Sequence, residues 1–215
     1  MSENTSGRTL DHVAGVYDLL SPLMLFGMEN RLSNKVIELL DTATIKRVLD
    51  IGCGTGTLTI NIARRLESEN LLVVGLDAAG KMIEIAREKA GTLANVRFDK
   101  GFAQKLAYPD ESFDAAVSTF FFHHIDLRSK IETLKEIKRV LAPGGQAVIL
   151  DVDVPTNLFG TVCAWSGYFL FRQDEIKENI RGQLRTAFDE AGFSWAKICT
   201  YMGYITLFKL EKEGA

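Results

Sequence analysis

Apolar and polar residues follow two different spacings along this chain, and the two spacings alternate. Short runs of mostly apolar residues predict buried strands, whereas apolar residues that recur every three or four positions predict helices with one buried face. The predicted strands of this part cover residues 46–50, 71–76, 96–98, 113–119 and 146–152. The predicted helices between them cover residues 58–66, 81–90 and 131–141. This alternation is typical of right-handed βαβ units around a parallel sheet.

The ends of the chain complete the pattern. A single helix is predicted at 174–191, followed by strands at 193–200 and 204–210. So few residues separate these two strands that they can pair only as an antiparallel hairpin. Two more helices are predicted at 11–20 and 28–40. The pattern therefore predicts an α/β fold with a seven-stranded, mostly parallel sheet, helices on both faces and a C-terminal antiparallel hairpin.

A glycine-rich loop follows the first predicted strand. Asp50 is followed by Gly52, Gly54 and Gly56, and a helix is predicted to begin directly after them. Glycine lets the backbone turn sharply and approach a ligand, and the N-terminus of a helix attracts polar or anionic groups. The dinucleotide pattern G-x-G-x-x-G would need glycine at position 57, where the chain has Thr57. The alternative is a structural turn between a strand and a helix.

Composition narrows the class of protein. The chain has 215 residues, of which 47% are hydrophobic and 25% charged, as in a soluble protein of one domain. The net charge of −3 gives no reason to expect a nucleic-acid partner. Residues 1–11 are polar and no apolar run reaches the length of a membrane span, so we expect neither a signal peptide nor integral membrane association. Three cysteines without metal or disulfide spacing favour a cytoplasmic protein.

Four motifs in a fixed order give a resemblance to a known family. Their residues are 48–56, 73–77, 112–118 and 139–145. In this order they resemble the class I S-adenosylmethionine-dependent methyltransferases. Residues 16–21 and 122–126 are similar to the branch that holds the ubiquinone/menaquinone C-methyltransferases. The resemblance implies a Rossmann-like fold and S-adenosylmethionine as cofactor.

The same resemblance implies how the chain is divided. Residues 1–215 would form a single methyltransferase domain with a flexible tail at 1–10. Residues 11–40 would form an N-terminal helical lid, and residues 153–172 an inserted apolar substrate lid.

The resemblance also implies which residues bind the cofactor. Asp50 would attract its ammonium group, and Asp77 would accept hydrogen bonds from the ribose hydroxyls. The alternative for Asp77 is a cap of the following helix. Met82 would contact the adenine, or else belong to the core. The expected cofactor-binding residues are Asp50, Gly52, Gly54, Thr55, Gly56, Asp77, Ala78, Met82, Phe102, Ala103 and Ser118.

One position departs from the family pattern. Relatives usually have Gly-Asp-Ala where this chain has Gly101-Phe-Ala, so Phe102 replaces the acid that binds the adenine amino group. Either the adenine is held by stacking and by backbone groups near Phe102 and Ala103, or Gln104 supplies the polar contact.

Methyl transfer from a sulfonium needs positioning more than an activating group, so we expect neither a metal nor a covalent intermediate. His123 follows the fourth strand and is the candidate general base, with simple packing as its alternative. His124 is expected to pack or to bond the loop backbone. Tyr17 is expected to bind the cofactor carboxylate, with an ordinary half-buried tyrosine as its alternative. Asp151 and Asp153 follow a strand and are expected to be solvated or capping, with a metal site as the less favoured alternative.

The segment 156–171 is apolar and aromatic, and no charged residue occurs in it. It is expected to form an apolar substrate lid over the site. Its alternatives are a helix docked on the core or at a dimer contact, and a membrane-surface helix, although no basic face accompanies it. The expected lid residues are Phe26, Phe159, Trp165, Tyr168 and Phe169.

The sequence thus predicts methyl transfer to a small, largely apolar acceptor by in-line displacement without metal. The alternatives are a cofactor-binding module without catalysis and an NAD-dependent oxidoreductase; Thr57 and the terminal hairpin count against the second. The expected partner is a small-molecule substrate, and the expected state is a monomer or a homodimer.

Overall fold

The computed structural model describes residues 27–40, 44–66 and 68–213. The predicted tail, the helix at 11–20, Tyr17 and Phe26 lie outside the described residues. The elements before the fourth strand are α2 (Glu29–Glu38), β1 (Arg47–Ile51), α3 (Thr57–Arg65), β2 (Leu72–Asp77), α4 (Gly80–Ala90) and β3 (Val96–Lys100). The central elements are β4 (Phe113–Thr119), the 3₁₀ turn η1 (Phe122–His124), α5 (Leu127–Val140) and β5 (Leu141–Val152). The last elements are α6 (Leu158–Phe171), α7 (Asp174–Ile180), α8 (Gln183–Glu190), β6 (Ser194–Tyr201) and β7 (Ile205–Glu211).

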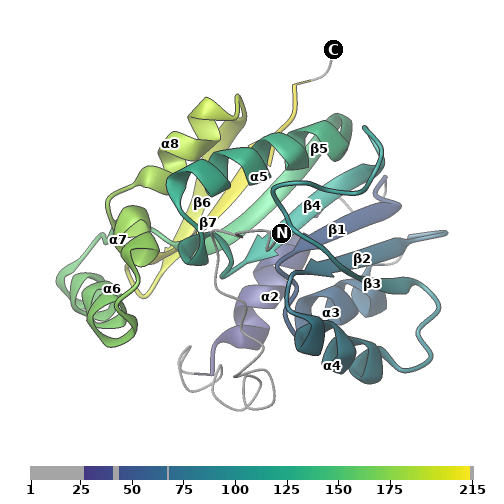
Figure 1. Cartoon of the computed structure of the whole chain (residues 1–215), viewed down its shortest axis with the longest axis horizontal. Helices are drawn as coiled ribbons and strands as arrows, with labels where there is room; N and C mark the ends of the chain where they lie inside the picture. Colours follow the sequence, from purple (N-terminus) through teal and green to yellow (C-terminus); the bar gives the residue numbers. More distant parts are fainter. Residues whose placement is uncertain (1–26, 41–43, 67, 214–215) are drawn as a thin grey trace, which may run out of the picture.

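The predicted sheet is confirmed. Its seven strands lie in the order β3-β2-β1-β4-β5-β7-β6 (Figure 1). The strands β1 to β5 pair in parallel, and β7 pairs antiparallel with both β5 and β6. The C-terminal hairpin therefore inserts its second strand next to β5, which gives the Rossmann-like arrangement that the sequence resemblance implies.

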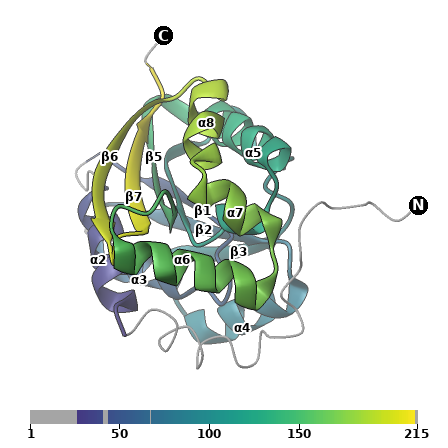
Figure 2. The same ribbon diagram turned by 90° about the vertical axis from the view of Figure 1, so that its left-hand side faces the viewer.

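Two apolar layers hold helices on opposite faces of the sheet (Figures 1 and 2). On one face, α5 and α8 bury Leu134 and Phe188 against strand residues such as Leu49. On the other, α2 and α3 bury Val36 and Ile62. Because both faces are covered, the central strands are apolar along their length, which is the pattern that predicted them.

The single helix predicted at 174–191 is wrong. The segment forms two helices, α7 and α8, with Gly182 between them in a left-handed conformation at φ +86°. Helix hydrogen bonding cannot continue through that conformation, and glycine adopts it without the cost of a Cβ. The break lets α8 pack on α5 while α7 packs on η1.

Helix α5 begins earlier than predicted, at Leu127. Asp126 is its N-cap and accepts a hydrogen bond from the amide of Ser129 at 2.8 Å. The strand β5 likewise begins at Leu141, five residues before the expected start.

The segment expected to be a lid forms the helix α6. Asn157 caps it by accepting a hydrogen bond from the amide of Gly160 at 2.7 Å. A Cβ on Gly160 would overlap the backbone of Gly203, in the turn between β6 and β7. The first turn of α6 is therefore packed directly on that hairpin turn. Among the described residues, the structure has no helix of the length and apolarity needed to cross a bilayer.

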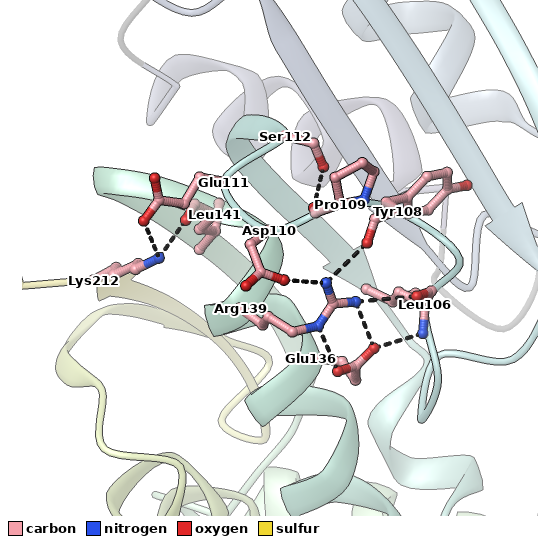
Figure 3. Close-up of polar contacts among 10 residues, drawn as sticks. All are labelled: Leu106, Tyr108, Pro109, Asp110, Glu111, Ser112, Glu136, Arg139, Leu141 and Lys212. Atoms are coloured by element: carbon pink, nitrogen blue, oxygen red, sulfur yellow. Dashed lines mark hydrogen bonds and ion pairs between the residues drawn. The ribbon is translucent and has the colours of Figure 1, made fainter.

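A guanidinium fixes the long loop that joins β3 to β4 (Figure 3). Arg139 of α5 donates to the backbone oxygens of Leu106 at 3.0 Å and Tyr108 at 2.8 Å. It also pairs with Asp110 at 2.7 Å and with Glu136 at 2.8 Å. Glu136 in turn accepts from the amide of Leu106 at 2.7 Å, and its ion pair with Arg139 lowers its pKa.

We expect Arg139→Met to lower the free energy of unfolding by about 2 kcal/mol, because two loop carbonyls lose their donor. For a chain of this length that corresponds to a fall in Tm of roughly 4–8 °C. Differential scanning calorimetry measures it. The matched control is Arg128→Met on the same helix, since the ion pair of Arg128 with Glu132 lies in solvent. Equal shifts in both variants would contradict the role of the network.

Candidate active site at the carboxyl edge of the sheet

The carboxyl ends of β1, β2, β4 and β5 meet at one edge, where the candidate residues gather. Ile51 is in register with Leu76 on one side and with Ser118 on the other. The strand order reverses between β1 and β4, and ligands of open α/β sheets bind outside the strand ends at such a point.

Glycine is required at the three positions of the first loop for different structural reasons. All three have positive φ, at +70° for Gly52, +53° for Gly54 and +77° for Gly56. A Cβ on Gly52 would lie 2.5 Å from the ring of Phe121, and one on Gly56 would lie 2.6 Å from the ring of Phe98. At Gly54 nothing lies within 4 Å. Packing therefore accounts for two glycines, and only Gly54 leaves open space for a ligand to approach the backbone.

Asp77 connects this loop to the next one. Its carboxylate accepts from the amide of Gly54 at 2.9 Å and from the amide of Ala79, the N-cap of α4, at 2.8 Å. Asp77 thus precedes the N-cap of α4 and holds its amide, whereas the helix itself has no side-chain cap; the bond to Gly54 is a role that the sequence did not indicate. A carboxylate has about four acceptor positions, so its bonds to these two amides are compatible with a role toward ligand hydroxyls.

Asp50 is buried beneath the glycine loop. It is 1% exposed, and the hydroxyl of Thr59 donates to it at 2.6 Å. Burial raises the pKa of Asp50 from 3.8 to about 7, although the hydrogen bond from Thr59 opposes the shift. Thr59 was not among the expected site residues; its position one turn into the helix is the signal that could have found it.

The other expected binding residues lie along the same edge. The amide of Gly101 donates to the carbonyl of Asp77 at 3.0 Å, which places residues 102–103 beside 77–78. Phe102 is 36% exposed. Met82 is buried against Ala79, in agreement with the alternative that it belongs to the core. Ala78 is half-buried and Ala103 is buried. Contact of these residues with a cofactor stays a prediction.

Two hydroxyl residues already have partners in the fold. The hydroxyl of Ser118 donates to the carbonyl of Ile51 at 2.9 Å and so links β4 to β1. The hydroxyl of Thr55 accepts from Lys89 at 3.0 Å. Their predicted role in binding also remains untested.

A histidine and a carboxylate form a close pair at the end of β4 and β5. The Nδ1 atom of His123 lies 2.7 Å from Asp151, whose side chain is fully buried. Asp151 also accepts from the amides of Phe122 at 2.8 Å and Val152 at 2.7 Å. Burial alone would raise the pKa of Asp151, but His123 and the backbone donors outweigh it and hold the pKa below its ordinary value. An ionised Asp151 fixes the proton of His123 on Nδ1 and leaves Nε2 to exchange a proton.

The expectation that Asp151 and Asp153 are solvated or capping is wrong. Asp153 is also fully buried, and Arg185 of α8 holds it with two hydrogen bonds of 3.0 and 2.6 Å. Asp151 also accepts from Asn179 at 3.4 Å, and both Asn179 and Arg185 come from helices some 30 residues later in the chain than these acids. Among the described residues there is no group of three or more ligating side chains suited to a metal ion.

His124 differs chemically from His123. Its ring lies 4.0 Å from that of His123, and its Nδ1 lies 3.3 Å from the side-chain oxygen of Gln173, not from the loop backbone. Burial, helped by the neighbouring His123, lowers the pKa of His124 to about 3. His124 is therefore neutral at physiological pH.

The aromatic residues of α6 face two sides. Trp165 and Tyr168 pack with Ile176 and Ile180 of α7, and their ring centroids lie 5.6 Å apart. The remaining lid candidates are exposed to 56% for Phe159 and 69% for Phe169. That these residues shelter an acceptor stays a prediction.

Comparison with known proteins shows to which family the sequence of this chain is similar. Residues 48–145 match the family described as "Methyltransferase domain". A demethylmenaquinone methyltransferase of Thermus thermophilus is 38% identical over 152 residues, which are 70% of this chain and 67% of that protein. The one of Thermotoga maritima is 35% identical over 70% of this chain, but the match spans only 62% of that relative. The one of Staphylococcus saprophyticus is 26% identical over 93% of this chain and 92% of its own.

Solved structures show the same fold at lower identity. A SAM-dependent methyltransferase from Aquifex aeolicus has a TM-score of 0.66 at 21% identity, covering 95% of this chain and 100% of that chain. The [4+2]-cyclase SpnF has a TM-score of 0.65 at 20% identity, covering 97% and 98%. Because one of these two is named as a cyclase, the fold alone does not determine the reaction.

Proposed function

Since this chain belongs to the class I S-adenosylmethionine-dependent methyltransferases and is homologous to the demethylmenaquinone methyltransferases, we propose that it methylates a ring carbon of a quinol. The observation that carries the proposal is the His123–Asp151 pair at the same sheet edge as the glycine loop. A quinol hydroxyl is weakly acidic, and its deprotonation makes the adjacent ring carbon nucleophilic. The family does not support the alternative of an NAD-dependent oxidoreductase.

The residues present fit the cofactor. The open space at Gly54 lets a ligand approach the backbone, and Asp77 lies against the same amide. Asp77 would hold the ribose hydroxyls, and Phe102 would lie against the adenine. When bound, S-adenosylmethionine supplies a methyl group on a sulfonium that is already activated for in-line displacement.

His123 is the proposed general base. Its Nε2 accepts the proton of the acceptor hydroxyl while Asp151 stabilises the resulting imidazolium. The ring carbon would form the new bond to the methyl while the demethylated cofactor leaves with the electron pair of the sulfur–methyl bond. The ring proton would then pass to solvent to restore the aromatic ring, and the imidazolium of His123 would return its proton to the ring oxygen. His124, neutral and next to His123, cannot supply a competing positive charge at this site.

The proposed substrate lid is α6, with Trp165 and Tyr168 on its inner side. An apolar cover excludes water from the reacting atoms. Tyr17 and Phe26 lie outside the described residues, so their part in this proposal rests on the sequence.

The test is transfer of a labelled methyl group from S-adenosylmethionine to a reduced demethyl-naphthoquinol with a short side chain. We expect one methyl group on a ring carbon, located by mass spectrometry and NMR, with equal rates with and without a metal chelator. Cofactor binding without transfer to any quinol would favour the non-catalytic module. Transfer only with a divalent ion would contradict the metal-free reaction.

Asp50 is expected to make cofactor affinity depend on pH. With a pKa of about 7, its carboxyl is mostly neutral at pH 6 and mostly ionised at pH 7.5. The ionised share rises from roughly 9% to 76%, so Kd for S-adenosylmethionine should fall about eightfold if only the ionised form attracts the ammonium. Because the pKa is raised on folding, this group's contribution to the free energy of unfolding decreases as pH rises from about 4 to 7.

Isothermal titration calorimetry across this pH range measures the effect. Asp50→Asn is the matched control, since it keeps the shape of the side chain and removes the titration. An equal pH dependence in the parent and in this variant would assign the effect to another group.

A further inference from the structure

The residue that follows β4 has a backbone conformation that its side chain disfavours. Phe120 has φ +54°, in the left-handed region that bulky residues rarely adopt. The other described non-glycine residues with positive φ are the exposed Asn70, Glu111 and Arg172 and the half-buried Met202. Phe120 is thus the one aromatic residue of this set. Such strain persists only where the surrounding contacts hold the backbone, and it is concentrated at functional sites.

The left-handed conformation exchanges the sheet faces of two phenylalanines. Along β4, Ala116 packs into the apolar layer under α5 and α8, and Val117 packs into the layer under α2 and α3. Regular alternation would direct Phe120 to the first layer and Phe121 to the second. The structure shows the reverse, because Phe120 packs against the α2–α3 layer and Phe121 against the α5–α8 layer.

After this exchange, both rings lie beside parts of the candidate site. The ring of Phe121 occupies the space that a Cβ on Gly52 would need. The ring of Phe120 meets the ring of His123 edge to face, with centroids 6.4 Å apart and planes at 76°. The amide of Phe120 also donates to the carbonyl of Leu150 in β5 at 2.9 Å. The turn between β4 and η1 therefore joins the glycine loop to the proposed base and brings an aromatic ring against that base.

The turn itself does not require a phenylalanine. Glycine would adopt the same φ at a lower cost. Phe120 is only half-buried, so the core covers part of its ring and leaves the rest open at the carboxyl edge of the sheet. An open aromatic ring beside His123 is placed to contact an aromatic acceptor, either edge to face or in an offset stack.

We propose that Phe120 forms one wall of the acceptor site and determines its preference for a planar aromatic ring. The inference rests on the proposed function, in which the acceptor is a quinol deprotonated by His123. Pairs of aromatic rings are stabilised beyond the area that they bury, by a factor of about 2 to 12 in a binding constant. Phe120 takes no part in proton transfer, so its loss should raise the KM of the acceptor and leave kcat nearly unchanged.

The first test measures binding and needs no turnover. Equilibrium dialysis of the full chain, with the demethylated cofactor present, gives the Kd of naphthol and of its fully saturated analogue decahydronaphthol. The aromatic preference is the ratio of the two Kd values, and we expect Phe120→Ala to reduce it about 2- to 12-fold relative to the parent. An unchanged ratio would overturn the proposal.

The second test separates KM from kcat with a short-chain naphthoquinol. Phe120→Ala should raise the KM of the acceptor at least tenfold, with kcat within fivefold and the Kd of S-adenosylmethionine within twofold of the parent. The matched control is Tyr108→Ala, which removes a half-buried ring packed edge to face on Phe113 at the other end of β4, with centroids 5.1 Å apart. Its KM should stay within twofold. Equal changes of KM in both variants would show that Phe120 has only a structural role.

The variant Phe120→Gly separates the ring from the backbone. It loses the ring as Phe120→Ala does, but glycine adopts a φ of +54° more readily than alanine. We therefore expect a higher Tm for Phe120→Gly than for Phe120→Ala, with the same increase in KM. A Tm that is no higher would contradict the left-handed conformation and the exchange of faces that depends on it.

The two proposals can fail separately. If the aromatic preference falls in Phe120→Ala but no quinol is methylated by the parent, the aromatic wall is supported and the proposed function alone fails. If the parent methylates the naphthoquinol and Phe120→Ala keeps its KM within twofold, the proposed function stands and the aromatic wall is wrong.

Discussion

Replacing His123 with alanine is expected to lower kcat for the quinol acceptor by about 100- to 10,000-fold, the range that a positioned general base contributes. The expectation rests on the 2.7 Å contact between Nδ1 and the buried Asp151, which leaves Nε2 as the atom that exchanges a proton. Cofactor affinity should stay within twofold, because the glycine loop and Asp77 belong to other strand ends. Steady-state kinetics together with calorimetry measure both quantities.

Two controls make this result specific. Free imidazole should restore part of the lost rate in His123→Ala, which a merely structural histidine would not show. His124→Ala removes a ring of the same kind that pairs with Gln173 and not with a carboxylate, so its kcat should change far less. A kcat in His123→Ala above one third of the parent value would remove His123 from the chemistry.

Replacing Asp77 with alanine is expected to raise the Kd of S-adenosylmethionine roughly 10- to 150-fold, or about 1.5–3 kcal/mol. The carboxylate has two roles that the variant removes together. It would accept the ribose hydroxyls, and it already holds the amide of Gly54 in place at 2.9 Å. Calorimetric titration with the cofactor and with its demethylated product measures the loss.

Asp114 offers a matched control for Asp77. It too accepts from two backbone amides, those of Lys46 and Arg47, both at 2.8 Å, but it lies at the start of β4. Asp114→Ala should therefore lower Tm without changing cofactor affinity. An affinity in Asp77→Ala within twofold of the parent would show that the ribose role is wrong.

The periodicity of the sequence predicted the sheet because strands that are buried on both faces are apolar along their whole length. Runs such as 71–76 are apolar throughout, and a short connection can only join antiparallel partners. The break at Gly182 was missed because an isolated glycine inside a helical pattern is tolerated, at a cost of about 1 kcal/mol relative to alanine. Only the packing of α7 on η1 and of α8 on α5 shows which applies here.

The candidate site was predicted unevenly for a similar reason. The glycine loop, Asp50 and Asp77 form local motifs, and the sheet brings them to one edge. The burial of Asp151 depends on His123 and on Asn179, which lie 28 positions before and after it. Contacts between residues so far apart leave no local spacing to detect, so the pair became visible only in the folded chain.

The contact between Gly160 and Gly203 has a mechanical consequence. It fixes α6 to the β6–β7 turn at its third residue, while the helix continues for eleven more. A tilt of the helix about that point leaves its first turn in place and moves its C-terminal end, by about 3 Å for each 10° of rotation. Trp165 and Tyr168 lie on the moving part. Any displacement of the helix therefore pivots on the hairpin, and a side chain larger than hydrogen at either glycine would shift the pivot itself.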